Sequence, residues 1–340
     1  MNSKKRIVYL DLIRVISMFI IVTYHFFAHF PENNINGFKI FSNSKWGIIG
    51  VALFFMISGA SLYCNYGEKI DLKKYFKKRF LGIFPMFWIA YFVIYLMLFF
   101  QTKTVPFGDL ANYKYLVSIV GMDGYLGFYI NTFYLIGEWF LGCIILIYIL
   151  FPIYRLLINK YPKIFFAISS IIGFGLMLFL KGTKMPVHMN LLVNSYSFIL
   201  GMYIFKYIKE IKWWQMLIAL AIPVGLYCIP AVAVNYVVTI ANCIAYCLFI
   251  VLAYVGMKIN NEIIENWLLV IGKYSYAVFL VHHYIIMKVE ATFQNSDLRL
   301  KGTVCLYLTV WLIIAIFSKI LYSTNKNILS MFKSKENSKG

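Results

Sequence analysis

The sequence predicts an all-α fold, a polytopic integral membrane protein with about ten transmembrane helices, and three observations carry that prediction. Hydrophobic residues make up 62% of the 340 residues and charged residues only 13%, whereas a soluble domain carries about a quarter charged residues. The apolar residues form long runs separated by short polar segments. The basic residues, which give a net charge of +19, lie at the ends of those runs, which favours contact with an anionic membrane leaflet and excludes nucleic acid as a partner.

Ten runs are long enough to cross a hydrocarbon core of about 30 Å at a helical rise of about 1.5 Å per residue. In chain order they are Ile7–Ala28, Trp46–Cys64, Phe80–Phe100, Phe133–Tyr154, Ile164–Leu180, Leu191–Phe205, Trp213–Ile229, Tyr236–Met257, Trp267–Met287 and Val304–Leu321. The sixth run is short, and Leu126–Tyr129 could extend the fourth. The first run contains charged residues and lacks a small-residue cleavage site, so it is predicted to be an uncleaved span.

An even number of spans places both termini on one side of the membrane, and the positive-inside rule predicts that this side is the cytoplasm. In that orientation the internal segments hold 20 of the 32 basic residues and the external loops hold nine. We therefore expect residues 1–322 to form a single ten-helix domain in the plasma membrane, followed by a short basic cytoplasmic tail at residues 323–340. The chain shows no internal repeat, which counts against a transporter built from inverted repeats.

The six cysteines lie in apolar runs and form no C-x-x-C pair or Cys/His cluster. We expect small apolar side chains at these positions, with no disulfide and no metal site. They are Cys64, Cys143, Cys228, Cys243, Cys247 and Cys305.

Ionisable residues inside membrane spans are costly, so each is a functional candidate by default. Asp11 and Arg14 are three residues apart and can pair on one helix face. Arg14 and His25 are eleven apart, which returns them to nearly the same face with about 16 Å between them along the axis. A structural ion pair and an interfacial histidine would explain the same pattern. The other candidates are Glu138 in the fourth run and Lys273, His282 and His283 in the ninth.

In the predicted topology His25, Glu138 and His282 lie at similar depth in the outer half of the membrane, on three different helices. A carboxylate and two imidazoles that converge in low dielectric suit proton transfer or activation of a nucleophile. Three unrelated interfacial residues would give the same depths, because helix neighbours cannot be read from sequence. His29 and His188, in or beside external loops, are expected to be solvated.

Five short motifs, in this order along the chain, resemble those of the membrane-bound acyltransferase-3 family. They are Tyr9–Arg14 with His25 following, Phe54–Gly59 in the second span, Tyr75–Pro85 entering the third, Glu138–Leu141 in the fourth, and Tyr274–His282 in the ninth. At Gly59, helix packing through small residues and close approach of a ligand are both open. One departure is Gly82, which stands where the family commonly has a second arginine three residues after Arg79.

The resemblance implies an enzyme that transfers an acyl group, usually acetyl from cytoplasmic acetyl-CoA, to a hydroxyl of an envelope or extracellular polysaccharide. It implies as partners the membrane lipid, a glycan or lipid-linked glycan acceptor and the machinery of polysaccharide synthesis. Arg14, Arg79, Lys77 and Lys78 would hold the donor phosphates. His25 would act as general base or acyl carrier.

The remaining candidates have supporting roles: Asp11 would fix the rotamer of Arg14, and Glu138 or His282 would orient His25 or take its proton. A transporter or flippase for a glycan or lipid-linked intermediate would use the same intramembrane charges as a pathway. A non-catalytic partner of a polysaccharide synthase is the third alternative, and it predicts that His25 can be replaced without loss.

Overall fold

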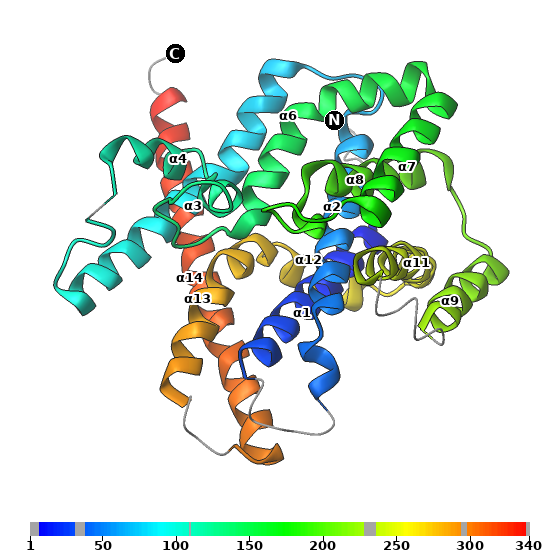
Figure 1. Cartoon of the computed structure of the whole chain (residues 1–340). Coiled ribbons are helices and arrows are strands. Elements are labelled where there is room, and N and C mark those ends of the chain that lie inside the picture. Colours follow the sequence, from blue (N-terminus) through cyan, green and yellow to red (C-terminus); the bar gives the residue numbers. More distant parts are fainter. Residues whose placement is uncertain (1–6, 31–37, 109, 228–235, 294–297, 338–340) are drawn as a thin grey trace. The chain divides into compact units, whose positions relative to one another are not determined.

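The computed structural model describes residues 7–30, 38–108, 110–227, 236–293 and 298–337. Within these ranges every regular element is a helix (Figure 1). The α-helices are α1 (Val8–His29), α2 (Ser44–Tyr66), α3 (Leu72–Thr102), α4 (Tyr115–Ile119), α5 (Asp123–Leu126), α6 (Glu138–Lys160), α7 (Pro162–Phe179), α8 (Leu191–Tyr207), α9 (Trp213–Tyr227), α11 (Val237–Lys258), α12 (Glu262–Gly272), α13 (Ser275–Phe293) and α14 (Leu300–Asn337). Short 3-10 turns are η1 (Lys39–Ser42), η2 (Asn112–Lys114) and η3 (Val187–Met189).

The all-α prediction is confirmed over the described residues, and each of the ten predicted runs overlaps a helix. In the part of the chain that the structure describes, seven helices are long and apolar enough to cross a membrane, or eight if the bent pair α12 and α13 counts as one span. α8 has 17 residues and α9 has 15, which makes them short for a span. Cys228 and residues 1–6 lie outside the described part of the chain.

Three predicted spans have different ends or shapes. The fourth begins at Glu138 and not at Phe133, because the backbone φ angles of Gly137 and Glu138 are +94° and +43° and a left-handed backbone cannot continue a right-handed helix. The ninth is broken after Gly272, with a bend of 53°. The tenth continues without a break to Asn337, so most of the predicted tail extends the last helix.

The chain divides into two compact units. Unit 1 comprises residues 1–28, 40–70 and 143–273, and in it α2 packs against α8 and α11 while α7 packs against α8. Its core is apolar: Leu53 and Met56 of α2 and Phe249 of α11 are fully buried. Side chains buried in this way are close-packed against one another, and close packing favours a single arrangement of these helices.

Backbones approach closely where α2 crosses α8. A Cβ atom at Gly59 would lie 2.0 Å from the Phe198 carbonyl oxygen, and one at Gly201 would lie 2.0 Å from the Met56 carbonyl oxygen. Only glycine fits at such distances, as in other membrane helix pairs that cross through small residues. Of the two interpretations of Gly59, the structure supports helix packing.

Polar side chains in unit 1 satisfy the backbone at the end of α2. The Arg155 Nε atom donates to the Tyr66 carbonyl at 2.6 Å, and the Asn159 Nδ2 atom donates to the Gly67 carbonyl at 2.8 Å. The last carbonyls of a helix have no partner within the helix. α6 supplies those partners here.

Unit 2 comprises residues 29–39, 71–142 and 274–340, and in it α14 packs against α13 and α3. The Tyr276 hydroxyl donates to the Ile83 carbonyl at 3.1 Å. Between α3 and α6 the backbone is largely irregular and carries the short helices α4 and α5. The Tyr115 and Phe133 rings stack there with centroids 4.0 Å apart. This segment leads directly into Glu138.

Candidate active site

Glu138 occupies a strained backbone position at the start of α6. Its φ of +43° is unusual for a residue with a side chain and costs about 1–3 kcal/mol, so it persists only where the surroundings impose it. Gly124 of α5 makes room for this backbone, because a Cβ there would lie 2.4 Å from the Glu138 carbonyl carbon. Strained residues of this kind concentrate at active sites.

The Glu138 carboxylate is held by two side chains of unit 2. Its Oε1 atom pairs with the Nδ1 atom of His283 on α13. Tyr134, in the irregular segment before α6, hydrogen-bonds to the same carboxylate; burial and this anion raise the pKa of Tyr134. The phenol therefore stays protonated and acts as donor to the carboxylate.

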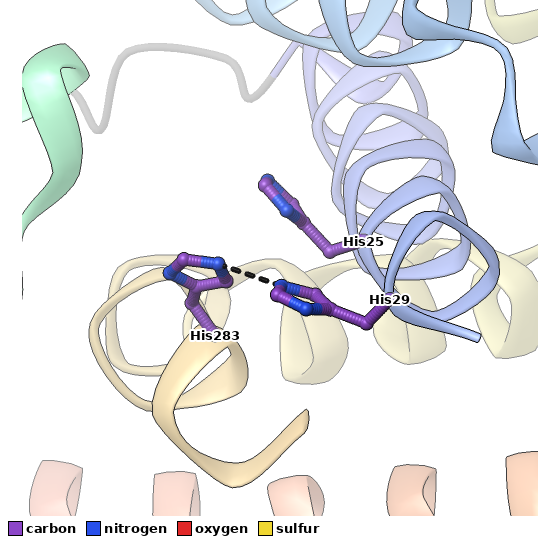
Figure 2. Close-up of side chains that lie close together, drawn as sticks. All are labelled: His25, His29 and His283. Carbon is purple, nitrogen blue, oxygen red and sulfur yellow. Dashed lines mark hydrogen bonds between the residues drawn. The ribbon is translucent and has the colours of Figure 1, made fainter. Parts of the chain in front are cut away.

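The second ring nitrogen of His283 extends the chain of contacts to the end of α1. Its Nε2 atom lies 3.0 Å from the Nε2 atom of His29, the hydrogen bond drawn in Figure 2. The carboxylate assigns the proton on His283 to Nδ1, so Nε2 accepts from His29 and the Nδ1 atom of His29 is left as a proton acceptor. Both ring nitrogens of His283 are thus engaged with protein groups, which is the geometry of a hydrogen-bonded chain.

His25 lies one helical turn before His29 on α1, so the two imidazoles project from successive turns of the same face (Figure 2). One ring nitrogen of His25 is within 4.8 Å of one ring nitrogen of His29. The face that the sequence predicts to carry Arg14 and His25 therefore continues to His29.

Asp11 and Arg14 form the predicted ion pair, with 2.8 Å between Arg14 NH1 and Asp11 Oδ1. The side chain of Asp11 is 13% exposed and that of Arg14 is 29% exposed, so the ion pair is mostly buried and still accessible to a ligand. Gly272 of α12 faces the pair: a Cβ there would lie 3.8 Å from Arg14 Cδ. Since a guanidinium has five N–H donors, Arg14 retains capacity to bind an anion.

His282 and His29 differ from their predicted surroundings. His282 is fully buried, and its Nδ1 atom lies 2.9 Å from the Phe279 carbonyl oxygen and 3.1 Å from that of Val278. It is the adjacent His283 that contacts Glu138. The prediction that His29 is solvated is wrong, since it is half-buried against His283.

The three candidate donor-binding cations of unit 2 lie near the start of α3. Lys77 and Lys78 are exposed, and Arg79 is partly buried. Asp71 starts the helix by accepting from the Lys74 N–H at 3.1 Å, which lowers the pKa of Asp71. At Gly82 a Cβ atom would meet nothing within 4 Å, so the absence of a second arginine there is not imposed by packing.

The long apolar helices fit a multi-pass membrane protein, and ionisable side chains such as Asp11 and His282 are buried in them. A family model described as an acyltransferase domain matches residues 7–322. The chain therefore belongs to the acyltransferase-3 family of membrane-bound acyltransferases, and it is an enzyme that transfers acyl groups. Searches of curated proteins and of solved structures found no match.

Proposed function

We propose that the enzyme moves an acyl group, acetyl in the first instance, from cytoplasmic acyl-CoA to a hydroxyl of a cell-envelope or extracellular polysaccharide. The observation that carries this proposal is the layout of α1. Arg14, held by Asp11, and His25 lie eleven residues apart on one face of that helix, about 16 Å along its axis. Coenzyme A is a long molecule whose thioester lies far from its phosphates. The separation along α1 would let Arg14 bind the phosphates while His25 lies near the thioester.

Arg14, Lys77, Lys78 and Arg79 are the proposed phosphate-binding groups, because guanidinium and ammonium groups are the usual protein partners of phosphate. His25 is the proposed general base. It takes the proton of the acceptor hydroxyl as the oxygen attacks the thioester carbonyl; the C–O ester bond forms, the C–S bond breaks, and CoA leaves as a thiolate. In the alternative, His25 is the acyl carrier. Its ring nitrogen attacks the thioester, so that a C–N bond forms as the C–S bond breaks; the acceptor hydroxyl then attacks this acyl-imidazole, the C–O ester bond forms, the C–N bond breaks, and the hydroxyl proton passes to the released imidazole. Glu138 or His282 is the proposed group that orients His25 or takes its proton.

The proposed topology has ten spans, which are the eight counted by length together with α8 and α9, and both termini in the cytoplasm of the plasma membrane. Under the positive-inside rule the basic start of α3 then faces the cytoplasm, where CoA is made. The external loops would meet the glycan or lipid-linked acceptor and the polysaccharide synthesis machinery. The family assignment favours transfer over transport, because a flippase needs no acyl donor and leaves its cargo unmodified.

The test is the O-acyl content of cell-surface glycans, measured by mass spectrometry in a strain that lacks the gene. The strain is complemented with wild type, with His25→Ala, or with His188→Ala as a matched histidine control from the η3 turn, at equal membrane levels. We expect wild type and His188→Ala to restore acylation and His25→Ala to leave it absent. Full acylation with His25→Ala would overturn the role of His25, and unchanged acylation on deletion would overturn the proposed function.

A further inference from the structure

A continuous set of contacts between ionisable groups in unit 2 runs from Tyr134 through Glu138 and His283 to His29. Its links are the Tyr134 hydrogen bond to Glu138, the Glu138–His283 ion pair and the 3.0 Å His283–His29 hydrogen bond. Three separate elements converge to make it: the start of α6, the middle of α13 and the last residue of α1. The proposed mechanism gives His29 and His283 no role, although the ring nitrogens of His283 contact Glu138 on one side and His29 on the other.

We infer that Glu138, His283 and His29 form a proton relay that carries away the proton which the acyl transfer releases. This inference rests on the proposed function of His25 as the base. His29 is the receiving end, because its Nδ1 atom is the acceptor that the hydrogen-bond pattern leaves and because His25 lies one turn away on α1. His283 and Glu138 are positioning residues that act through His29.

The proton that His25 has taken from the hydroxyl binds His29 at Nδ1. His29 then releases its Nε2 proton to His283 Nε2, and the imidazolium of His283 is stabilised by the Glu138 carboxylate at its Nδ1 side. A proton leaves the relay to water, and the CoA thiolate takes a proton from water. The net reaction converts hydroxyl and thioester into ester and thiol.

The strain at Glu138 fits this role. A carboxylate at the first position of an ordinary helix requires no positive φ, yet Glu138 has one, directly after the positive φ of Gly137. The missing Cβ of Gly124 leaves room for this backbone, and Tyr134 hydrogen-bonds to the carboxylate. Such a fixed carboxylate assigns the tautomer of His283, as second partners of histidine commonly do. Among the described residues, further titratable groups near the relay include Glu290 of α13, which interacts with His29, and His282, which interacts with His283.

The decisive pair of variants is His29→Gln and His29→Ala. Gln can donate a hydrogen bond to His283 Nε2 in place of His29 but cannot pass a proton on, whereas Ala removes both functions. A relay predicts that both variants lose about 10²-fold in the acyl-transfer rate, the lower end of general acid–base contributions. A purely structural histidine predicts that Gln retains the wild-type rate.

The assay uses membrane vesicles with radiolabelled acetyl-CoA, and the surface-glycan fraction of the deletion strain serves as acceptor. Free imidazole should restore the rate of His29→Ala several-fold and leave the His188→Ala control, which should match wild type, unchanged. We also expect His283→Gln to lower the maximal rate and to change its pH profile with little change in the KM for acetyl-CoA.

Three outcomes would overturn the relay. One is a wild-type rate in His29→Gln, another is failure of imidazole to rescue a folded His29→Ala protein, and the third is a stoichiometric metal ion in the wild type that His29→Ala lacks. If the wild-type vesicles transfer no label at all, the proposed function fails and not the relay alone. A fluorescence-detected elution profile equal to that of wild type identifies folded variants.

Discussion

The two units of this enzyme use glycine for opposite purposes. In unit 1, Gly59 and Gly201 let two regular helices touch backbone to backbone, and side chains of α6 hydrogen-bond to the carbonyls at the end of α2. In unit 2, Gly124 and Gly137 accommodate a backbone that departs from the helix at Glu138. Unit 1 thus gains stability from regular packing, while unit 2 retains strain that fixes the directions of Glu138 and, through it, His283.

The difference teaches which substitutions should affect folding and which should affect chemistry. Changes at the tight crossing in unit 1 should lower the free energy of unfolding. Changes at the strained carboxylate in unit 2 should lower the rate while the protein stays folded. Four predictions test this division, beginning with the largest effect.

Glu138→Gln should reduce acyl transfer by about 10²- to 10³-fold without lowering the yield of folded protein. The amide keeps the shape of the carboxylate but loses the charge that pairs with His283. Activity is measured with labelled acetyl-CoA in vesicles, and folding by thermal denaturation. An unfolded Glu138→Gln protein would show that the carboxylate supports stability, and the contrast between the units would then fail.

Gly201→Ala should destabilise unit 1 by about 2 kcal/mol or more, because its Cβ would lie 2.0 Å from the Met56 carbonyl oxygen and overpacking of this kind is costly. The matched control is Gly175→Ala on α7, where a Cβ meets nothing within 4 Å. Alanine should stabilise that position slightly, by up to about 1 kcal/mol, through helix propensity. Apparent Tm values that shift in the same direction for both variants would contradict the close crossing.

Asp123→Asn should make the protein more stable at neutral pH and have no effect near pH 4. Asp123 of α5 is 1% exposed, and burial raises its carboxyl pKa from 3.8 to about 6, an effect that the nearby Ser118 hydroxyl only partly opposes. Because the folded protein prefers the protonated acid, its stability is greatest below about pH 4 and falls as pH rises through 6. Each pKa unit corresponds to about 1.4 kcal/mol, so the variant should gain about 3 kcal/mol in the free energy of unfolding at pH 7.5. Denaturation measured at pH 4 and at pH 7.5 checks this.

The exposed Asp71 provides the opposite case for that experiment. Its pKa is lowered chiefly by the Lys74 N–H, so its contribution to stability is present above its unfolded pKa and lost as pH falls through its folded pKa. The Asp71→Asn variant should therefore show no increase in the free energy of unfolding at pH 7.5. An equal gain from both variants would mean that net charge, and not burial, causes the effect.

Gly82→Arg should have the smallest effect, a few-fold decrease in the KM for acetyl-CoA with kcat unchanged. The position has open space around its Cα, and a second guanidinium three residues after Arg79 lies near it on the same helix. Gly82→Gln adds similar bulk without charge and should leave KM as in wild type. Equal KM values for the arginine and glutamine variants would show that this position does not contact the donor.

Hydropathy and charge alone determined much of this protein. The ten apolar runs correspond to helices, and the Asp11–Arg14 pair and the Arg14–His25 face follow from helix periodicity, because these features depend only on neighbours within one segment of chain. Local sequence also contained the signals that prediction underused: His29 is four residues after His25, and His283 directly follows His282.

Tertiary structure decided the rest. That Glu138 pairs with His283, that His283 reaches His29, and that His282 is directed at the carbonyls of its own helix depend on which helices are neighbours and how each is rotated. The start of α6 at Glu138 and the break after Gly272 likewise lie within apolar runs whose hydropathy is continuous. Hydropathy measures the free-energy cost of exposing a segment to water. That cost does not depend on which neighbouring helix buries the segment, so hydropathy cannot identify the neighbour.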